Sequence, residues 1–143
     1  MFEGWKYQKI CEIPHGSYHE EALSEYVYQF ALSQGYTAMR DTCHNVLVRI
    51  PASEGREQEP SYLFQGHLDM VCEKEADISH DFLKDPIKIH SEEDWLMAEG
   101  TTLGGDDGIA VAYMLALMEE ASQISHPSLE LLMTSAEEVG MDG

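Results

Sequence analysis

Apolar side chains follow a helical pattern near the start of the chain. In the range 17–35 they recur at helical spacing, at Leu23, Val27, Phe30 and Ala31. Ser17 and Glu20 fit the capping-box pattern that opens a helix, and Gly35 stands where a helix would stop. The spacing predicts one amphipathic helix over this range.

Shorter apolar runs bounded by turn residues predict strands. The runs are, in chain order, "YTAMR" at 36–40, "NVLVRIP" at 45–51, "YLFQGHLDM" at 62–70 and "LELLMTS" at 129–135. "IKIH" and "WLMA", separated by "SEED", predict a small hairpin, and the breaker-rich "ASEGREQEPS" predicts a surface loop.

The run "GIAVAYMLALM" at 108–118 is apolar nearly all round, so it predicts a helix that is buried on more than one side. Helices that alternate with continuous apolar strands favour an α/β fold, here a mainly parallel mixed sheet with helices on both faces. In such sheets, ligands bind beyond the carboxyl ends of the strands.

Composition narrows the class of protein. At 143 residues and 43% apolar content, the chain has the size and make-up of one globular domain. Its 27 acidic residues against 8 Lys and Arg give a net charge of −19. Nucleic acids and anionic membranes bind through cationic contacts, so neither is an expected partner. The charge is compatible with cation binding, but acidic surfaces more often serve solubility alone.

Other sequence features concern location. The three cysteines, Cys11, Cys43 and Cys72, are widely spaced and form no CxxC pair, which favours a reducing compartment over a disulfide framework. The start "MFEGWKYQKICEIPHG" lacks the apolar core of a signal peptide, and no apolar run approaches the ~20 residues of a membrane span. These features predict a cytoplasmic protein.

The strand-like run 62–70 ends in a candidate metal ligand. His67 and Asp69 are two positions apart, so in extended backbone their side chains share a face. A metal-bound imidazole usually donates its other N–H to a carboxylate, and Asp69 is placed to accept it. The alternative is an ordinary hydrogen-bonded histidine at the end of a strand.

Two further acidic segments contain candidate metal ligands, and each also has a simpler structural interpretation. In "GGDDG", Asp106 and Asp107 open the buried helix, where they would either bind cations or simply cap the helix N-terminus. In "AEE", Glu137 and Glu138 follow the last strand, as ligand and general base or as an exposed acidic turn. The chain has no GKS or GKT phosphate loop and no G-x-S-x-G nucleophile motif.

The order of these motifs resembles a known family. "IPHGSYHEE", "QGHLDMVCEK", "HDFLKDPI", "GTTLGGDDGIA" and "EEVGMDG" are similar to the bacterial aminoacyl-histidine dipeptidases. These belong to the zinc-dependent peptidase superfamily that includes carboxypeptidase G and peptidase T. The resemblance extends over essentially the whole chain.

The resemblance implies a role for each candidate residue. His67 would bind one metal ion, Asp106 would bridge two, and Glu138 would bind the second. Glu137 would be the general base that takes a proton from water and returns it to the leaving amine, with Asp69 orienting His67. The implied cofactors are two divalent ions, with zinc favoured and manganese or cobalt as alternatives. A cis peptide is also implied at the first aspartate of the pair.

The implied function is hydrolysis of dipeptides, of the carnosine-like Xaa-His type. Alternatives are a tripeptide aminopeptidase or N-deacylase of the same superfamily, and a non-catalytic acidic α/β module.

The resemblance also implies a domain arrangement, in which residues 1–143 are the N-terminal portion of a metallopeptidase catalytic domain. Two further ligands, an acid and a histidine, and an inserted domain for the lid and dimerisation would lie outside it. We therefore expect the parent protein to be a homodimer. The isolated chain should bind metal weakly, turn over little or no substrate and self-associate through unfinished sheet edges.

Overall fold

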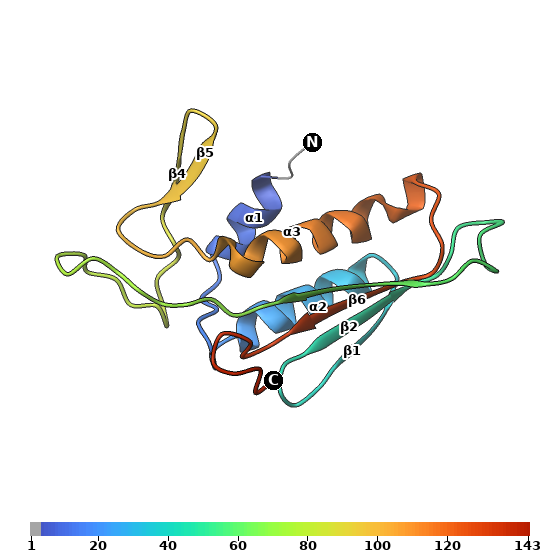
Figure 1. Cartoon of the computed structure of the whole chain (residues 1–143), viewed down its shortest axis with the longest axis horizontal. Helices are drawn as coiled ribbons and strands as arrows, with labels where there is room; N and C mark the ends of the chain where they lie inside the picture. The colour runs from blue at the N-terminus through green and yellow to red at the C-terminus, as the bar shows by residue number, and fades with distance from the viewer. Residues whose placement is uncertain (1–3) are drawn as a thin grey trace.

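A computed structural model describes residues 4–143 as three helices beside a four-stranded sheet (Figure 1). The helices are α1 (Gly4–Cys11), α2 (Glu21–Ser33) and α3 (Gly105–Glu120), followed by the short 3₁₀ turn η1 (Ala121–Gln123). The sheet contains β1 (Thr37–Arg40), β2 (Val46–Ile50), β3 (Tyr62–His67) and β6 (Leu129–Thr134). A separate hairpin is formed by β4 (Ile89–Glu92) and β5 (Trp95–Ala98).

The sheet is mixed, with the order β1-β2-β6-β3. β6 runs parallel to β3, whereas β1 with β2 and β2 with β6 are antiparallel pairs. The α/β class and the mixed sheet are confirmed, but the prediction of a mainly parallel sheet is wrong for these strands. An apolar run reports burial and not direction, and the short turn between β1 and β2 permits only an antiparallel pair.

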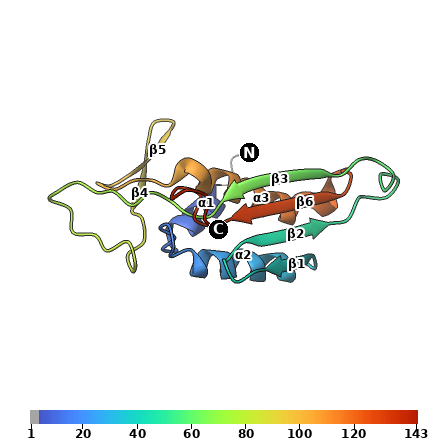
Figure 2. The same ribbon diagram turned by 60° about the horizontal axis from the view of Figure 1, so that its bottom comes forward.

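Within residues 4–143, the helices cover one face of the sheet and not both (Figure 2). The α2 helix packs on β1 and β2, α3 packs on β3, and both α1 and α2 contact α3. On this face the side chains of β2 and β6 are buried, while the intervening positions of these strands are more exposed. The prediction of helices on both faces is therefore wrong here, although α3 is buried on several sides as its composition predicts.

The start of α2 differs from the predicted capping box. The helix begins at Glu21, and no side-chain hydrogen bond caps it. Ser17 instead donates its hydroxyl to Asp69 at 2.7 Å. Glu20 accepts hydrogen bonds from backbone N–H groups at Tyr18 and Ala136. Both side chains are therefore used by contacts that are distant in sequence, which the local pattern does not reveal. The N-terminal helix α1 has no counterpart among the predicted elements.

No helix in the range 4–143 is both long and apolar enough to cross a membrane.

Candidate metal centre

The parallel pair β3 and β6 brings two of the acidic segments together. His67 is paired with Thr134, so both strands end at the same edge of the sheet. The N–H of Leu68 then donates to the carbonyl of Thr134 at 2.7 Å. This hydrogen bond holds the segments that follow β3 and β6 side by side. Glu137 and Glu138 follow β6 by a few residues and therefore lie next to His67.

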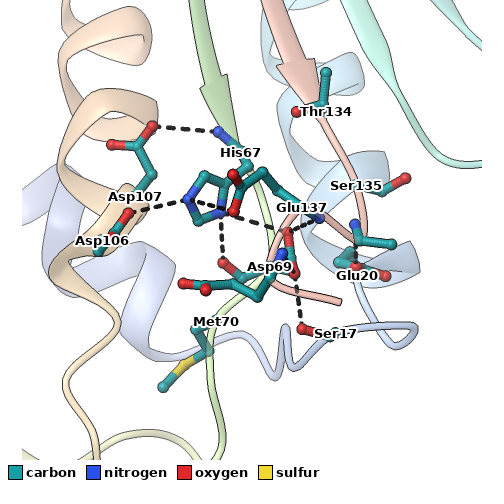
Figure 3. A network of polar contacts seen from close by, with 12 residues as sticks. Ser17, Glu20, His67, Asp69, Met70, Asp106, Asp107, Thr134, Ser135 and Glu137 are labelled. Carbon is teal, nitrogen blue, oxygen red and sulfur yellow. Dashed lines mark hydrogen bonds and ion pairs between the residues drawn. The ribbon is translucent and has the colours of Figure 1, made fainter. Parts of the chain in front are cut away.

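The start of α3 brings the third segment to the same edge. Gly104 takes a left-handed conformation with φ of 71°, which glycine adopts without steric cost. The Asp106–Asp107 peptide is cis, as the resemblance implies, and both residues have non-helical backbone angles. Neither acid caps the helix: Asp106 points to the His67 ring, and Asp107 accepts the His67 backbone N–H at 3.3 Å (Figure 3).

His67 is buried and has a fixed orientation. Its Nδ1 lies 3.0 Å from the backbone carbonyl of Asp69, which can only accept, so Nδ1 carries the proton. Its Nε2 faces Asp106 Oδ1 at 3.0 Å and Glu137 Oε2 at 3.7 Å. Burial opposes protonation, but the bonds to Asp106 and Asp69 and the nearby carboxylates raise the pKa of His67 above its usual value. The ring therefore presents Nε2 to a strongly anionic pocket that attracts cations.

The donor atoms of three residues converge. Within the described residues, one ligand atom each from His67, Asp106 and Glu138 lie within 4.8 Å of one another. Atoms that bind one ion at about 2.1 Å lie no more than ~4.2 Å apart, and the ions of a two-metal site are about 3.5–4 Å apart. Donor atoms within this limit suit ligands of one ion or of two neighbouring ions, so these residues form a possible metal site.

Asp69 makes contacts beyond the one predicted with His67. Its fully buried carboxylate lies 3.4 Å from His67 Nδ1, but its short hydrogen bonds come from elsewhere. It accepts the Ser17 hydroxyl and the N–H groups of Glu137 and Glu138, at 2.7, 2.9 and 3.1 Å. The His67 ring is held mainly by the Asp69 backbone carbonyl, and the carboxylate organises the turn that carries the two glutamates.

A largely apolar hollow of about 380 Å³ adjoins these ligands. Glu138 lines one part of it, and Val71, Phe82, Leu83 and Val139 line much of the rest. Apolar hollows with a few convergent polar groups are the usual form of small-molecule sites.

Comparison with known proteins agrees with this geometry. No protein-family model matches the chain. Over 137 residues it is 47% identical to the cytosol non-specific dipeptidase of Escherichia coli, a match that covers 96% of this chain and 28% of that protein. The similarity is to a dipeptidase.

A solved structure supports the same comparison. The aminoacylhistidine dipeptidase from Vibrio alginolyticus matches with a TM-score of 0.92 and 43% identity, over 97% of this chain and 28% of that one. The chain therefore spans little more than a quarter of the length of either relative.

More distant structures share the fold. The aminopeptidase PepT from Bacillus cereus has a TM-score of 0.76 at 18% identity, over 96% of this chain and 36% of that chain. A dinuclear metal-binding peptidase from Bacillus subtilis has a TM-score of 0.55 at 14% identity, over 94% of this chain and 35% of that chain. The predicted likeness to the fold of peptidase catalytic domains is confirmed.

Proposed function

We propose that the protein is a dinuclear metal-dependent dipeptidase and that residues 1–143 are part of its catalytic domain. The observation that carries the proposal is the convergence of donor atoms from His67, Asp106 and Glu138 within 4.8 Å. These residues come from three separate segments, and an exposed acidic surface does not require such an arrangement. The similarity to a dipeptidase over nearly the whole chain supports the same activity.

Each residue has a proposed role. His67 and Glu138 would each hold one ion and Asp106 would be the ligand shared by both, with zinc favoured over manganese or cobalt because imidazole and carboxylate ligands suit it. When bound, the ions supply Lewis-acid polarisation of the amide carbonyl and a lowered pKa for water. Glu137 takes a proton from the attacking water and returns it to the leaving amine. Asp69 holds the Glu137 backbone in place through its hydrogen bond.

We infer a dipeptide substrate of the Xaa-His type, because the aminoacylhistidine dipeptidase structure matches so closely. A cytoplasmic location is proposed from the similarity to a cytosol dipeptidase. The whole protein is proposed to act as a homodimer.

The proposal is tested first by metal binding. Zn²⁺ is titrated calorimetrically into the wild-type chain, Asp106→Ala and Asp94→Ala. Asp94 is an exposed acid of the β4–β5 turn, so its removal makes the same charge change away from the site. We expect Asp106→Ala to weaken binding by at least about 100-fold, as loss of a ligand should exceed loss of a supporting group. Equal binding by all three chains would overturn the proposed site.

Hydrolysis then separates the candidate activities. Single-turnover assays with excess chain compare an Xaa-His dipeptide, a tripeptide and an N-acyl amino acid. The expected result is slow dipeptide cleavage that a chelator and Glu137→Gln each abolish. Cleavage of the tripeptide alone would favour the aminopeptidase alternative, and cleavage of the N-acyl substrate alone would favour the N-deacylase. Bound metal without any cleavage by the parent protein would favour the non-catalytic module.

A further inference from the structure

The turn after β6 has four consecutive backbone N–H groups that are all bound by side chains from elsewhere. Ser135 N–H donates to Asn45 Oδ1 at 2.9 Å, and Ala136 N–H donates to Glu20 Oε1 at 2.8 Å. The next two, at Glu137 and Glu138, donate to the two carboxylate oxygens of Asp69. Three distant side chains therefore hold the backbone of this turn, and Asp69 alone binds the N–H groups of the two glutamates.

Glu20 is one of two buried carboxylates among these three acceptors, the other being Asp69. It is only 1% exposed, although it carries a carboxylate, and it lies at the N-terminus of α2, where the helix dipole favours negative charge. A buried carboxylate is costly to fold unless its oxygens accept hydrogen bonds. Its Oε1 accepts two, from the N–H of Ala136 at 2.8 Å and from the N–H of Tyr18 at 3.1 Å.

Both donors have a left-handed backbone. Tyr18 has φ of 66° and Ala136 has φ of 51°, a region that residues with a side chain seldom adopt. Such a conformation persists only where the surrounding structure holds it. Ala136 immediately precedes Glu137, so its backbone angles set the direction in which the two glutamates leave the sheet.

We propose that Glu20 is a positioning residue for the Glu137–Glu138 pair. It acts through the Ala136 N–H and touches neither the metal ligands nor the substrate. The inference rests on the proposed function, because it assigns Glu20 to the same site. If the proposal is correct, the ability of Oε1 to accept a hydrogen bond matters more for the position of the two glutamates than the negative charge of Glu20 does.

The test compares four variants with the wild type. Glu20→Ala removes the acceptor, and Glu20→Asp keeps the charge but withdraws the oxygen by one methylene. Glu20→Gln removes the charge and keeps an acceptor of the same shape. Glu21→Ala removes the exposed neighbouring carboxylate and is the matched control. Circular dichroism first establishes which variants fold.

Two readouts are measured, and neither requires catalysis. Amide hydrogen exchange of residues 135–138 without metal reports the turn itself. Co²⁺ titration, followed by the visible absorption of the bound ion, reports the ligands. We expect Glu20→Ala and Glu20→Asp to lose protection in this segment and to bind Co²⁺ about 10–100-fold more weakly. Glu20→Gln and Glu21→Ala should resemble the wild type in both measurements.

The outcomes separate this inference from the proposed function. Wild-type protection and Co²⁺ affinity in folded Glu20→Asp would overturn the positioning role and leave the metal site intact. Loss of exchange protection and of Co²⁺ affinity in Glu20→Gln would also overturn the positioning role. The negative charge of Glu20, and not its hydrogen-bond acceptor, would then hold the turn. A parent protein that binds no Co²⁺ would overturn the proposed function, and the exchange measurement would still decide whether Glu20 holds the turn.

Discussion

Gly66 lies in β3 where the backbone of the strand forms a wall of the metal-ligand cluster. A Cβ atom at this position would lie 2.8 Å from Asp107 Oδ2, 2.9 Å from the Ala110 side chain and 3.1 Å from the Met114 side chain. All three distances are shorter than a normal contact, so any side chain here would force α3 away from the sheet.

We therefore predict that Gly66→Ala lowers the free energy of unfolding by about 1–3 kcal/mol, as overpacking of a tight interior does. Urea unfolding measures it. Gly105→Ala is the control, because a Cβ there would lie 4.0 Å from its nearest neighbour, the Tyr7 hydroxyl. Equal stability of the two variants would show that β3 and α3 have room to spare.

His15 provides a pH dependence of stability. Burial lowers its pKa below the usual value of about 6.5, against the opposing effects of its bond to the Ile13 carbonyl and the charges of Asp69 and Glu20. In the unfolded chain His15 takes up a proton as the pH falls through about 6.5, whereas in the folded chain it stays neutral to a lower pH. The unfolded state binds more protons in this window, so acid favours unfolding.

We predict that this group removes up to about 1.4 kcal/mol of stability per pH unit below about 6.5, and none above it. Urea unfolding at about pH 7.5 and about pH 5.5 should show a larger loss on acidification for the wild type than for His15→Asn. His90→Asn, an exposed histidine of β4, is the matched control for the loss of one imidazole. An identical pH dependence in wild type and His15→Asn would contradict the prediction.

At the scale of single residues, the sequence predicts the metal-ligand cluster but not the residues whose hydrogen bonds support it. His67, Asp106 and Glu138 stand in short motifs at the ends of apolar runs, so chemistry and position are visible together. Glu20 and Asn45 are single polar residues whose acceptor atoms meet partners 116 and 90 positions away. No local pattern records such contacts.

At the scale of elements, hydrophobic periodicity predicts α2, the strands and the buried α3, because each has a continuous apolar stripe or run. It does not predict α1. The buried Lys6 of this helix forms an ion pair with Glu119 of α3, a helix that is distant in sequence. Nor does periodicity predict strand direction, which depends on the connections and not on burial. The parallel β3–β6 pair is the one that matters for the site, because it places the acidic segments that follow β3 and β6 at the same edge of the sheet.

At the scale of the whole molecule, β3 is an edge strand of the described sheet (Figure 2). Tyr62, Leu63 and Phe64 on this strand are 59%, 58% and 46% exposed. An exposed apolar edge offers both unpaired backbone groups and hydrophobic surface to a second chain.

We predict that the chain self-associates through this edge and that Leu63→Lys shifts it towards the monomer, because a charged residue blocks edge-to-edge pairing. Sedimentation velocity over a range of concentrations measures the change. Leu83→Lys is the control, as Leu83 is equally exposed at 58% but lies outside the strands. A wild type that sediments as a monomer throughout would contradict the prediction.

The four backbone N–H groups of the turn after β6, each hydrogen-bonded to a distant side chain, also bear on the order in which the protein folds. Their acceptors lie 68 to 116 residues earlier in the chain. Contacts this remote require long loops to close, and they form late for that reason. We therefore expect the ligand cluster to exist only after α2, α3, β3 and β6 have docked, so that a partly folded chain offers no such cluster to an ion. Because metal would bind the native state alone, its uptake would stabilise finished molecules selectively and report the completion of folding.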